Sequence, residues 1–126
     1  MPNDDNQGTM LFDWTTGALA EGLRCYQNQE FFAAHEHWEA EWLRCDEPEK
    51  TFLQALIQIT AAFHHMKRGN ITGTLSLLRA AYGRLQNFPA QFQGIAVEEL
   101  RLTIHCWLDA LEDSSELPRL PFPQIG

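Results

Sequence analysis

The stretch FLQALIQITAAF, residues 52–63, decides the fold of this chain. Its largest apolar side chains recur at three-and-four spacing, and alanines and further aliphatic residues cover most of the rest of the helix surface. A helix that is apolar nearly all round is buried at the centre of a protein. We therefore predict a long central helix that begins at the capping signal Asp46-Glu47-Pro48-Glu49 and ends at about Arg68, before Gly69.

The rest of the chain predicts four more helices and no convincing strand, because apolar residues follow helical spacing nearly everywhere. These helices are expected over residues 16–28, 30–44, 71–87 and 97–112. Residues 1–12 are polar and predicted to be flexible, although Leu11, Phe12 and Trp14 could dock on the bundle. Residues 117–126 form an extended, proline-rich tail. The predicted fold class is all-α: a single compact bundle of about five helices over residues 1–126, with a buried central third helix.

Composition limits the function classes. The net charge of −8 repels phosphate backbones and argues against nucleic-acid binding. Three widely spaced cysteines without a C-x-x-C pair are typical of reduced thiols. The N-terminus lacks the basic and apolar regions of a signal peptide, and polar residues interrupt the apolar stretch Leu53–Met66, so no membrane span is expected. We expect a cytoplasmic protein.

Two strips of polar residues make the candidate site. A short link between the second and third helices predicts an antiparallel hairpin whose partners pack along much of their length. If the strips face each other, a buried network forms in which Glu39 accepts from Gln58 or a histidine, and Gln54 satisfies a further lone pair. The candidate residues are His35, Glu36 and Glu39 on the second helix and Gln54, Gln58 and His65 on the third.

These motifs carry a family resemblance. The pattern Phe31-x-x-x-His35-Glu36-x-x-Glu39-x-x-Trp42, followed by FLQ-x-LIQ, His65 and Gly69-Asn70, resembles a family of small bacterial and archaeal helical proteins. That family is the domain of unknown function number 309, and the resemblance extends roughly from Thr16 to Leu111. Glycine usually follows the first glutamine there, whereas this chain has Ala55. The resemblance implies an all-helical bundle with its signature on the second and third helices, and it implies no activity.

Three interpretations of the polar cluster remain open. The first is a structural network or a pocket for a small ligand. The second is a metal-dependent hydrolase, in which His35 and Glu39 hold the metal, Glu36 is the base and His65 is a third ligand. Replacement of the second histidine of an H-E-x-x-H motif by Glu39 argues against it, so neither metal nor cofactor is expected.

The third interpretation is a protein-interaction module. Ala62–Phe88 resembles one tetratricopeptide helical pair, although such repeats need at least three units to bury their faces. The acidic surface and the apolar tail leave a homodimer or another protein partner open. The ligand is unknown, and whether the proline-rich tail docks on its own chain or on a partner is also left open.

Overall fold

Helix α4 (Glu49–Lys67) lies at the centre of the molecule in the computed structural model, which describes residues 10–113 and 118–126. More than half of its side chains are buried, on several faces of the helix, including Phe52, Leu56 and Phe63. It packs against α3 on one side and α5 on the other. The predicted buried central helix is confirmed, because apolar side chains cover most of its surface between Phe52 and Phe63.

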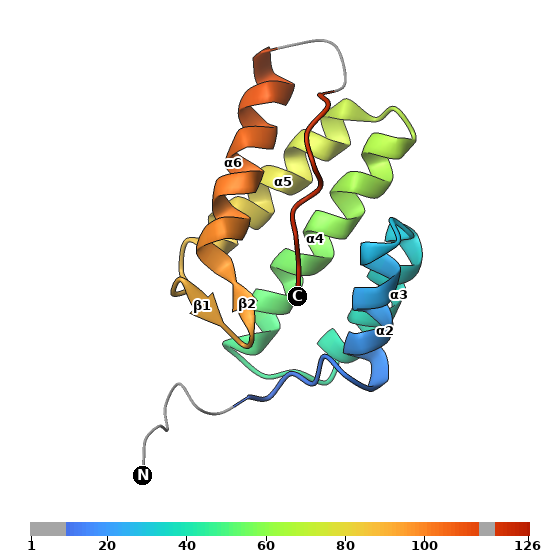
Figure 1. Cartoon of the computed structure of the whole chain (residues 1–126), viewed down its shortest axis with the longest axis vertical. Coiled ribbons are helices and arrows are strands. Elements are labelled where there is room, and N and C mark those ends of the chain that lie inside the picture. Colours follow the sequence, from blue (N-terminus) through green and yellow to red (C-terminus); the bar gives the residue numbers. More distant parts are fainter. Residues whose placement is uncertain (1–9, 114–117) are drawn as a thin grey trace.

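The regular secondary structure of the described residues consists of five helices and one small hairpin (Figure 1). The all-α prediction is therefore confirmed. No helix in these residues has both the length and the apolarity that crossing a membrane requires. The helices and strands are α2 (Gly17–Gln27), α3 (Phe31–Trp42), α4 (Glu49–Lys67), α5 (Ile71–Leu85), β1 (Gln91–Phe92), β2 (Ile95–Ala96) and α6 (Val97–Asp113).

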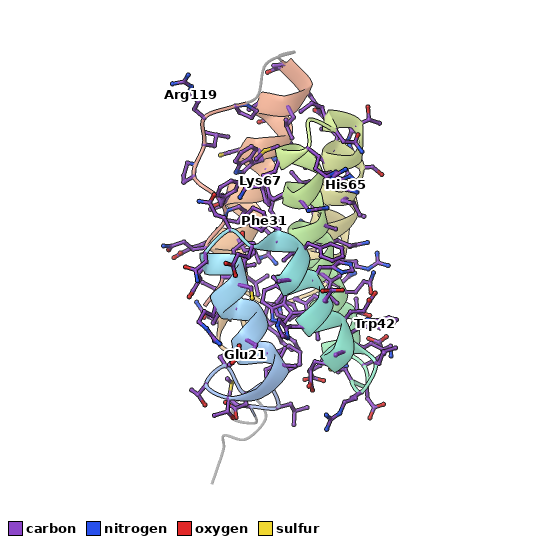
Figure 2. All side chains as sticks on the ribbon, turned by 90° about the vertical axis from the view of Figure 1, so that its right-hand side faces the viewer. Glu21, Phe31, Trp42, His65, Lys67 and Arg119 are labelled. Carbon is purple, nitrogen blue, oxygen red and sulfur yellow. The ribbon has the colours of Figure 1, made fainter. Side chains whose placement is uncertain are left out.

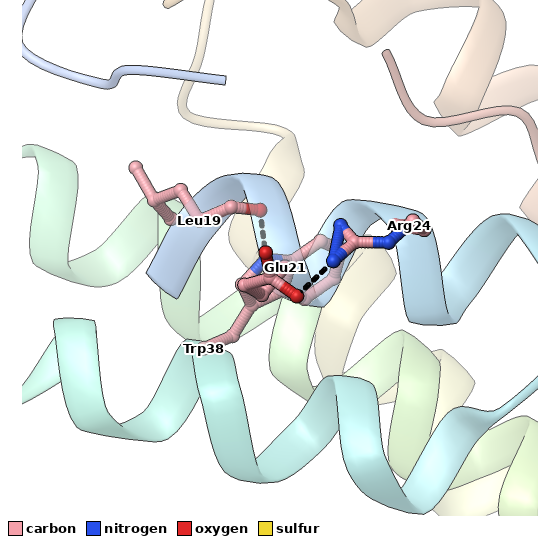
Figure 3. Close-up of polar contacts among 4 residues, drawn as sticks. All are labelled: Leu19, Glu21, Arg24 and Trp38. Carbon is pink, nitrogen blue, oxygen red and sulfur yellow. Dashed lines mark hydrogen bonds and ion pairs between the residues drawn. The ribbon is translucent and has the colours of Figure 1, made fainter. Parts of the chain in front are cut away.

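Helices α2 and α3 form a hairpin that lies against α4. Trp38 of α3 is fully buried between them, and its Nε1 donates to the carbonyl oxygen of Leu19 in α2 at 3.0 Å (Figure 3). Glu21 and Arg24, both largely exposed, form an ion pair on α2 (Figure 3). Trp38 therefore fixes how the two helices meet.

The hairpin of β1 and β2 corrects the prediction that the chain has no strand. Gln91 pairs with Ala96 and Phe92 with Ile95, and the two turn residues Gln93 and Gly94 both have positive φ. Positive φ at both positions is the requirement of a type I′ turn, which matches the twist of paired strands. Each strand is two residues long, which is too short for an alternating pattern to be visible in the sequence.

The same hairpin holds the start of the described chain. Gln93 Oε1 accepts the backbone N–H groups of Leu11 at 2.8 Å and Phe12 at 3.0 Å, and Gln93 O accepts from Trp14 Nε1. Phe12 is buried against Phe52. Of residues 1–12, which were expected to be flexible, the first nine lie outside the described residues, and Phe12 belongs to the core.

Residues 118–126 run extended over the bundle, across α4 and between α6 and α2 (Figure 1). Trp107 Nε1 donates to Pro121 O at 2.9 Å, and Tyr26 Oη donates to Pro123 O at 2.6 Å. The Phe122 ring packs against Phe63 and Trp107. The tail thus docks on its own chain, since two buried donors and an aromatic pocket bind it there; Leu117 lies outside the described residues.

The N-terminus of α4 differs from the predicted capping box. Asp46 and Glu49 form no side-chain cap, and Pro48 precedes the helix instead of lying in its first turn. Glu47 Oε1 accepts the backbone N–H of Thr51 at 2.9 Å and its hydroxyl at 2.6 Å. These bonds lower the pKa of Glu47, so this carboxylate caps the first turn of the helix.

Candidate functional site

A cavity of about 250 Å³ lies between α3 and α4, and a residue of α5 completes its wall. Four of the six polar residues proposed from the sequence line it, two from each helix, together with apolar side chains. We call this space the α3–α4 cavity. Its lining residues are His35, Glu39, Trp42, Gln54, Ile57, Gln58, Ala61 and Leu77.

Helical spacing brings these side chains together. His35, Glu39 and Trp42 are four and three residues apart on α3, and Gln54, Gln58 and Ala61 have the same spacing on α4. Residues 43–48 reverse the chain between the two helices. Each helix therefore presents one continuous strip to the other.

Two polar atoms of the lining residues are buried without a hydrogen-bond partner: Trp42 Nε1 and Gln58 Oε1. Leaving such a group unpaired costs roughly 1–3 kcal/mol. Within the described residues, Glu39 forms no hydrogen bond to Gln58 or Gln54, although the spacing suggested both. The two strips therefore leave a cavity between them and do not form a closed hydrogen-bond network.

The indole of Trp42 is unlike the other three in the chain. Trp42 is half-buried, and Lys50 Nζ lies 4.1 Å from the centre of its ring. Each of the other three indole N–H groups donates to a backbone carbonyl: Trp14 to Gln93, Trp38 to Leu19 and Trp107 to Pro121. Trp42 alone of the four tryptophans has a free N–H donor.

Glu36 and His65 lie outside the cavity. Glu36 is exposed on α3, about 100° around the helix from His35. His65 lies near the end of α4, far from Trp42 along the length of the bundle (Figure 2), and its Nδ1 is 3.1 Å from Asn70 Nδ2. His65, the third ligand of the hydrolase hypothesis, therefore does not join Glu39, and Glu36, its base, does not line the cavity.

The described part of the chain contains no group of three or more His, Cys, Asp or Glu residues that could hold a metal ion. His35 and Glu39 share the cavity wall, but His65 does not join them. The structure thus does not bring together the ligand set that the metal-dependent interpretation requires.

An aromatic cluster borders the cavity at His35. Phe32 is more than half exposed, and its ring stacks on His35 with 6.4 Å between centroids. His64 lies 5.4 Å from the Phe32 ring. Burial lowers the pKa of His64, and the nearby Arg68 and histidines lower it further. The Phe32 ring thus lies beside both His35 and His64 at the edge of the cavity.

Sequence comparison agrees with the resemblance carried by the motifs. Residues 19–77 match the model of a family described as Domain of unknown function (DUF309). The resemblance to DUF309 is confirmed. A relative, an uncharacterized protein of Aquifex aeolicus (strain VF5), is 31% identical over 84 residues, which are 66% of this chain. The chain spans about a quarter of the length of that relative, since the match covers 25% of it.

The DUF309 segment contains the whole α3–α4 cavity. It extends from the third residue of α2 into the first half of α5. All eight lining residues, from His35 to Leu77, fall inside it. Sequence reasoning missed four of these residues as parts of the site: Trp42, Ile57, Ala61 and Leu77. Trp42 was detectable, because it follows Glu39 by three residues and His35 by seven, whereas nothing marks Leu77 among the apolar residues of α5.

Proposed function

We propose that the α3–α4 cavity binds a small molecule that carries both a hydrogen-bond donor and an acceptor. The observation that supports this most strongly is the pair of buried, unpartnered atoms on facing helices, Trp42 Nε1 and Gln58 Oε1. Trp42 needs an acceptor and Gln58 needs a donor. A ligand with both groups would satisfy the two atoms at once.

The walls indicate what else the ligand carries. The carboxylate of Glu39, in a chain of net charge −8, favours an ammonium or an amide over an anion. Ile57, Ala61 and Leu77 offer contact to a short apolar part. A volume of about 250 Å³ suits a ligand smaller than a typical drug. We therefore expect a small amide, or an ammonium that also carries an acceptor oxygen, with an aliphatic body.

A purely structural role accounts less well for these features. A structural network stabilises a protein when its polar groups satisfy one another, and a half-satisfied network is worse than an apolar core. Here Trp42 Nε1 and Gln58 Oε1 reduce stability unless something binds them. Binding sites commonly lower stability in this way in the absence of their ligand.

The test uses three small molecules that share an isopropyl group: isobutyramide, isobutylammonium and isobutyrate. The full chain is labelled with ¹⁵N, and the four indole N–H signals are followed as each probe is added, with Trp42→Phe assigning the signal of Trp42. We expect the amide to shift the Trp42 signal downfield, the ammonium to perturb it through Glu39, and isobutyrate to have little effect. The other three indoles are internal controls, because each already donates to a carbonyl.

Variants then assign the contacts. Gln58→Leu should abolish the response to the amide, and Glu39→Gln should weaken the response to the ammonium selectively. His37→Ala, on an exposed position of the same helix, should change neither. If no probe moves the Trp42 signal, or if Gln58→Leu responds as the wild type does, the proposal is wrong.

A further inference from the structure

A second hollow of about 300 Å³ adjoins the α3–α4 cavity and shares two of its residues, Trp42 and Gln54. We call it the basic hollow. It lies where the loop before α4 meets the first turns of α4 and the last turn of α5. Its lining residues are Trp42, Glu47, Lys50, Thr51, Gln54 and Arg84.

The two spaces carry opposite charge. The α3–α4 cavity has the carboxylate of Glu39, whereas the basic hollow has the cations Lys50 and Arg84 and one anion, Glu47. Glu47 Oε1 is already bonded to the backbone N–H and the hydroxyl of Thr51. The hollow therefore has a net positive lining in a chain whose net charge is −8.

Arg84 is the cation without a partner. It is half-buried on α5 and forms no ion pair and no side-chain hydrogen bond within the described residues. The other half-buried arginine, Arg101, donates to two backbone carbonyls, and the exposed Arg79 pairs with Glu112. A half-buried guanidinium with five free donors is suited to a carboxylate or a phosphate, which it can bind through two parallel bonds.

Lys50 is oriented toward the same place by Trp42, one of the two residues that both spaces share. Its Nζ lies above the Trp42 ring and donates to the backbone oxygen of Trp42 at 3.2 Å. One of its three donors is used there, and no carboxylate lies within ion-pair distance among the described residues. Lys50 and Arg84 can thus bind one anionic group from two helices.

Building on the proposed function, we infer that the ligand is dipolar. Its ammonium or amide end lies in the α3–α4 cavity near Glu39, and its carboxylate or phosphate end lies in the basic hollow at Arg84 and Lys50. Trp42 and Gln54 line the passage between the two ends. The ligand class is therefore a small aminocarboxylic acid or a phosphorylated amine.

The test compares molecules that differ in one charged end. Calorimetry and the Trp42 indole signal measure binding of δ-aminovalerate, of n-butylamine, which lacks the carboxylate, and of valerate, which lacks the amine. A series of β-alanine, γ-aminobutyrate and ε-aminocaproate then shows which distance between the two charged ends gives the tightest binding. Phosphoethanolamine against β-alanine separates a phosphate end from a carboxylate end. We expect the best dipolar probe to bind at least about tenfold more tightly than its matched amine, as one added charge-assisted hydrogen bond would give.

Arg84→Gln should remove that advantage and leave the affinity for n-butylamine unchanged, with Arg84→Lys giving an intermediate loss. Arg79→Gln is the control, because Arg79 lies on the same helix but pairs with Glu112 at 2.5 Å, away from the hollow. If the amine moves the Trp42 signal but no dipolar probe binds more tightly, or if Arg84→Gln binds the dipolar probes as the wild type does, the dipolar inference is wrong and the proposed function stands. If no probe moves the Trp42 signal, both fail.

Discussion

Gly22 of α2 lies directly against the indole ring of Trp38 in α3. A Cβ at residue 22 would overlap the Cδ1 and Nε1 atoms of that ring. The Trp38 ring cannot withdraw, because its Nε1 donates to Leu19 O, while Tyr26 stacks on it with 6.1 Å between centroids. The close approach of α2 and α3 therefore depends on a residue without a side chain at position 22.

Gly22→Ala should therefore destabilise the protein. The added methyl group pushes apart two helices that Trp38 holds in place, and overpacking of this kind typically costs about 1–3 kcal/mol. Alanine also favours a helix over glycine by about 1 kcal/mol, so the observed loss in the free energy of unfolding is the difference between the two effects. Urea unfolding measures it.

Gly83→Ala is the matched control. Gly83 lies in α5, and a Cβ there meets nothing within 4 Å. The helix propensity of alanine acts alone at this position, so the free energy of unfolding should rise by about 0.5–1 kcal/mol. If Gly22→Ala gained as much as Gly83→Ala, the contact with Trp38 would not be a packing constraint.

The helices were predictable because each has a regular apolar pattern, and α4 was predictable as the central one because polar residues are few between Phe52 and Phe63. The hairpin at residues 91–96 was not, because two-residue strands have no period. Phe12, at the end of the segment predicted to be flexible, is one of the residues that could dock, and it is buried in the core. What holds it is a pair of hydrogen bonds to Gln93, some 80 residues away, and no local pattern reports a contact of that range.

The sequence predicts which face of each helix carries the candidate site, but not where along the helix the site ends. Helical spacing gives the angular position of a side chain, which is why His35, Glu39, Gln54 and Gln58 face the same space. It does not show how far along their lengths α3 and α4 stay in contact. His65 shares the strip with Ala61, but it lies one turn further on, where the turn after α4 offers Asn70 as a partner.

The buried Tyr26 predicts a loss of stability at alkaline pH. Burial raises the pKa of Tyr26 well above its usual value of 10. In the unfolded chain the phenol ionises near pH 10, while in the folded protein it stays protonated and bonded to Pro123 O. Its contribution to stability is therefore complete below pH 10 and declines above it, by up to about 1.4 kcal/mol per pH unit.

Tyr26→Phe separates this contribution from the rest of the alkaline titration. At neutral pH the variant should be less stable than the wild type by about 1 kcal/mol, for the lost hydrogen bond. The gap should narrow and then close as the pH rises beyond 10, which denaturant unfolding across that range would detect. A gap that stays constant would mean that Tyr26 is not buried under the tail. Tyr82→Phe, on a half-buried ring of α5, should leave neutral-pH stability within about 0.5 kcal/mol.

The buried hydroxyl of Thr74 should stabilise the turn between α4 and α5. Its Oγ1 donates to Asn70 O at 2.8 Å and lies 3.1 Å from Ala62 O. Thr74→Val keeps the shape but leaves these carbonyls without that donor, so we expect a loss of about 1–2 kcal/mol in unfolding experiments. Thr72→Val, exposed two residues earlier, should change stability by less than about 0.5 kcal/mol. Equal effects at both positions would contradict the role of the buried hydroxyl.

The three thiols should differ in reactivity. Burial raises the pKa of Cys25 and of Cys45, and nearby carboxylates raise both further, Glu30 at Cys25 and Glu41 at Cys45. Because the thiolate is the reactive form, both should react slowly, whereas Cys106 is exposed on α6 and should react first. Labelling of the native protein with a disulfide reagent near pH 8 should show one fast thiol and two slow ones, and Cys106→Ser should remove the fast phase alone. A fast phase that survives in Cys106→Ser would show that burial does not protect the other two.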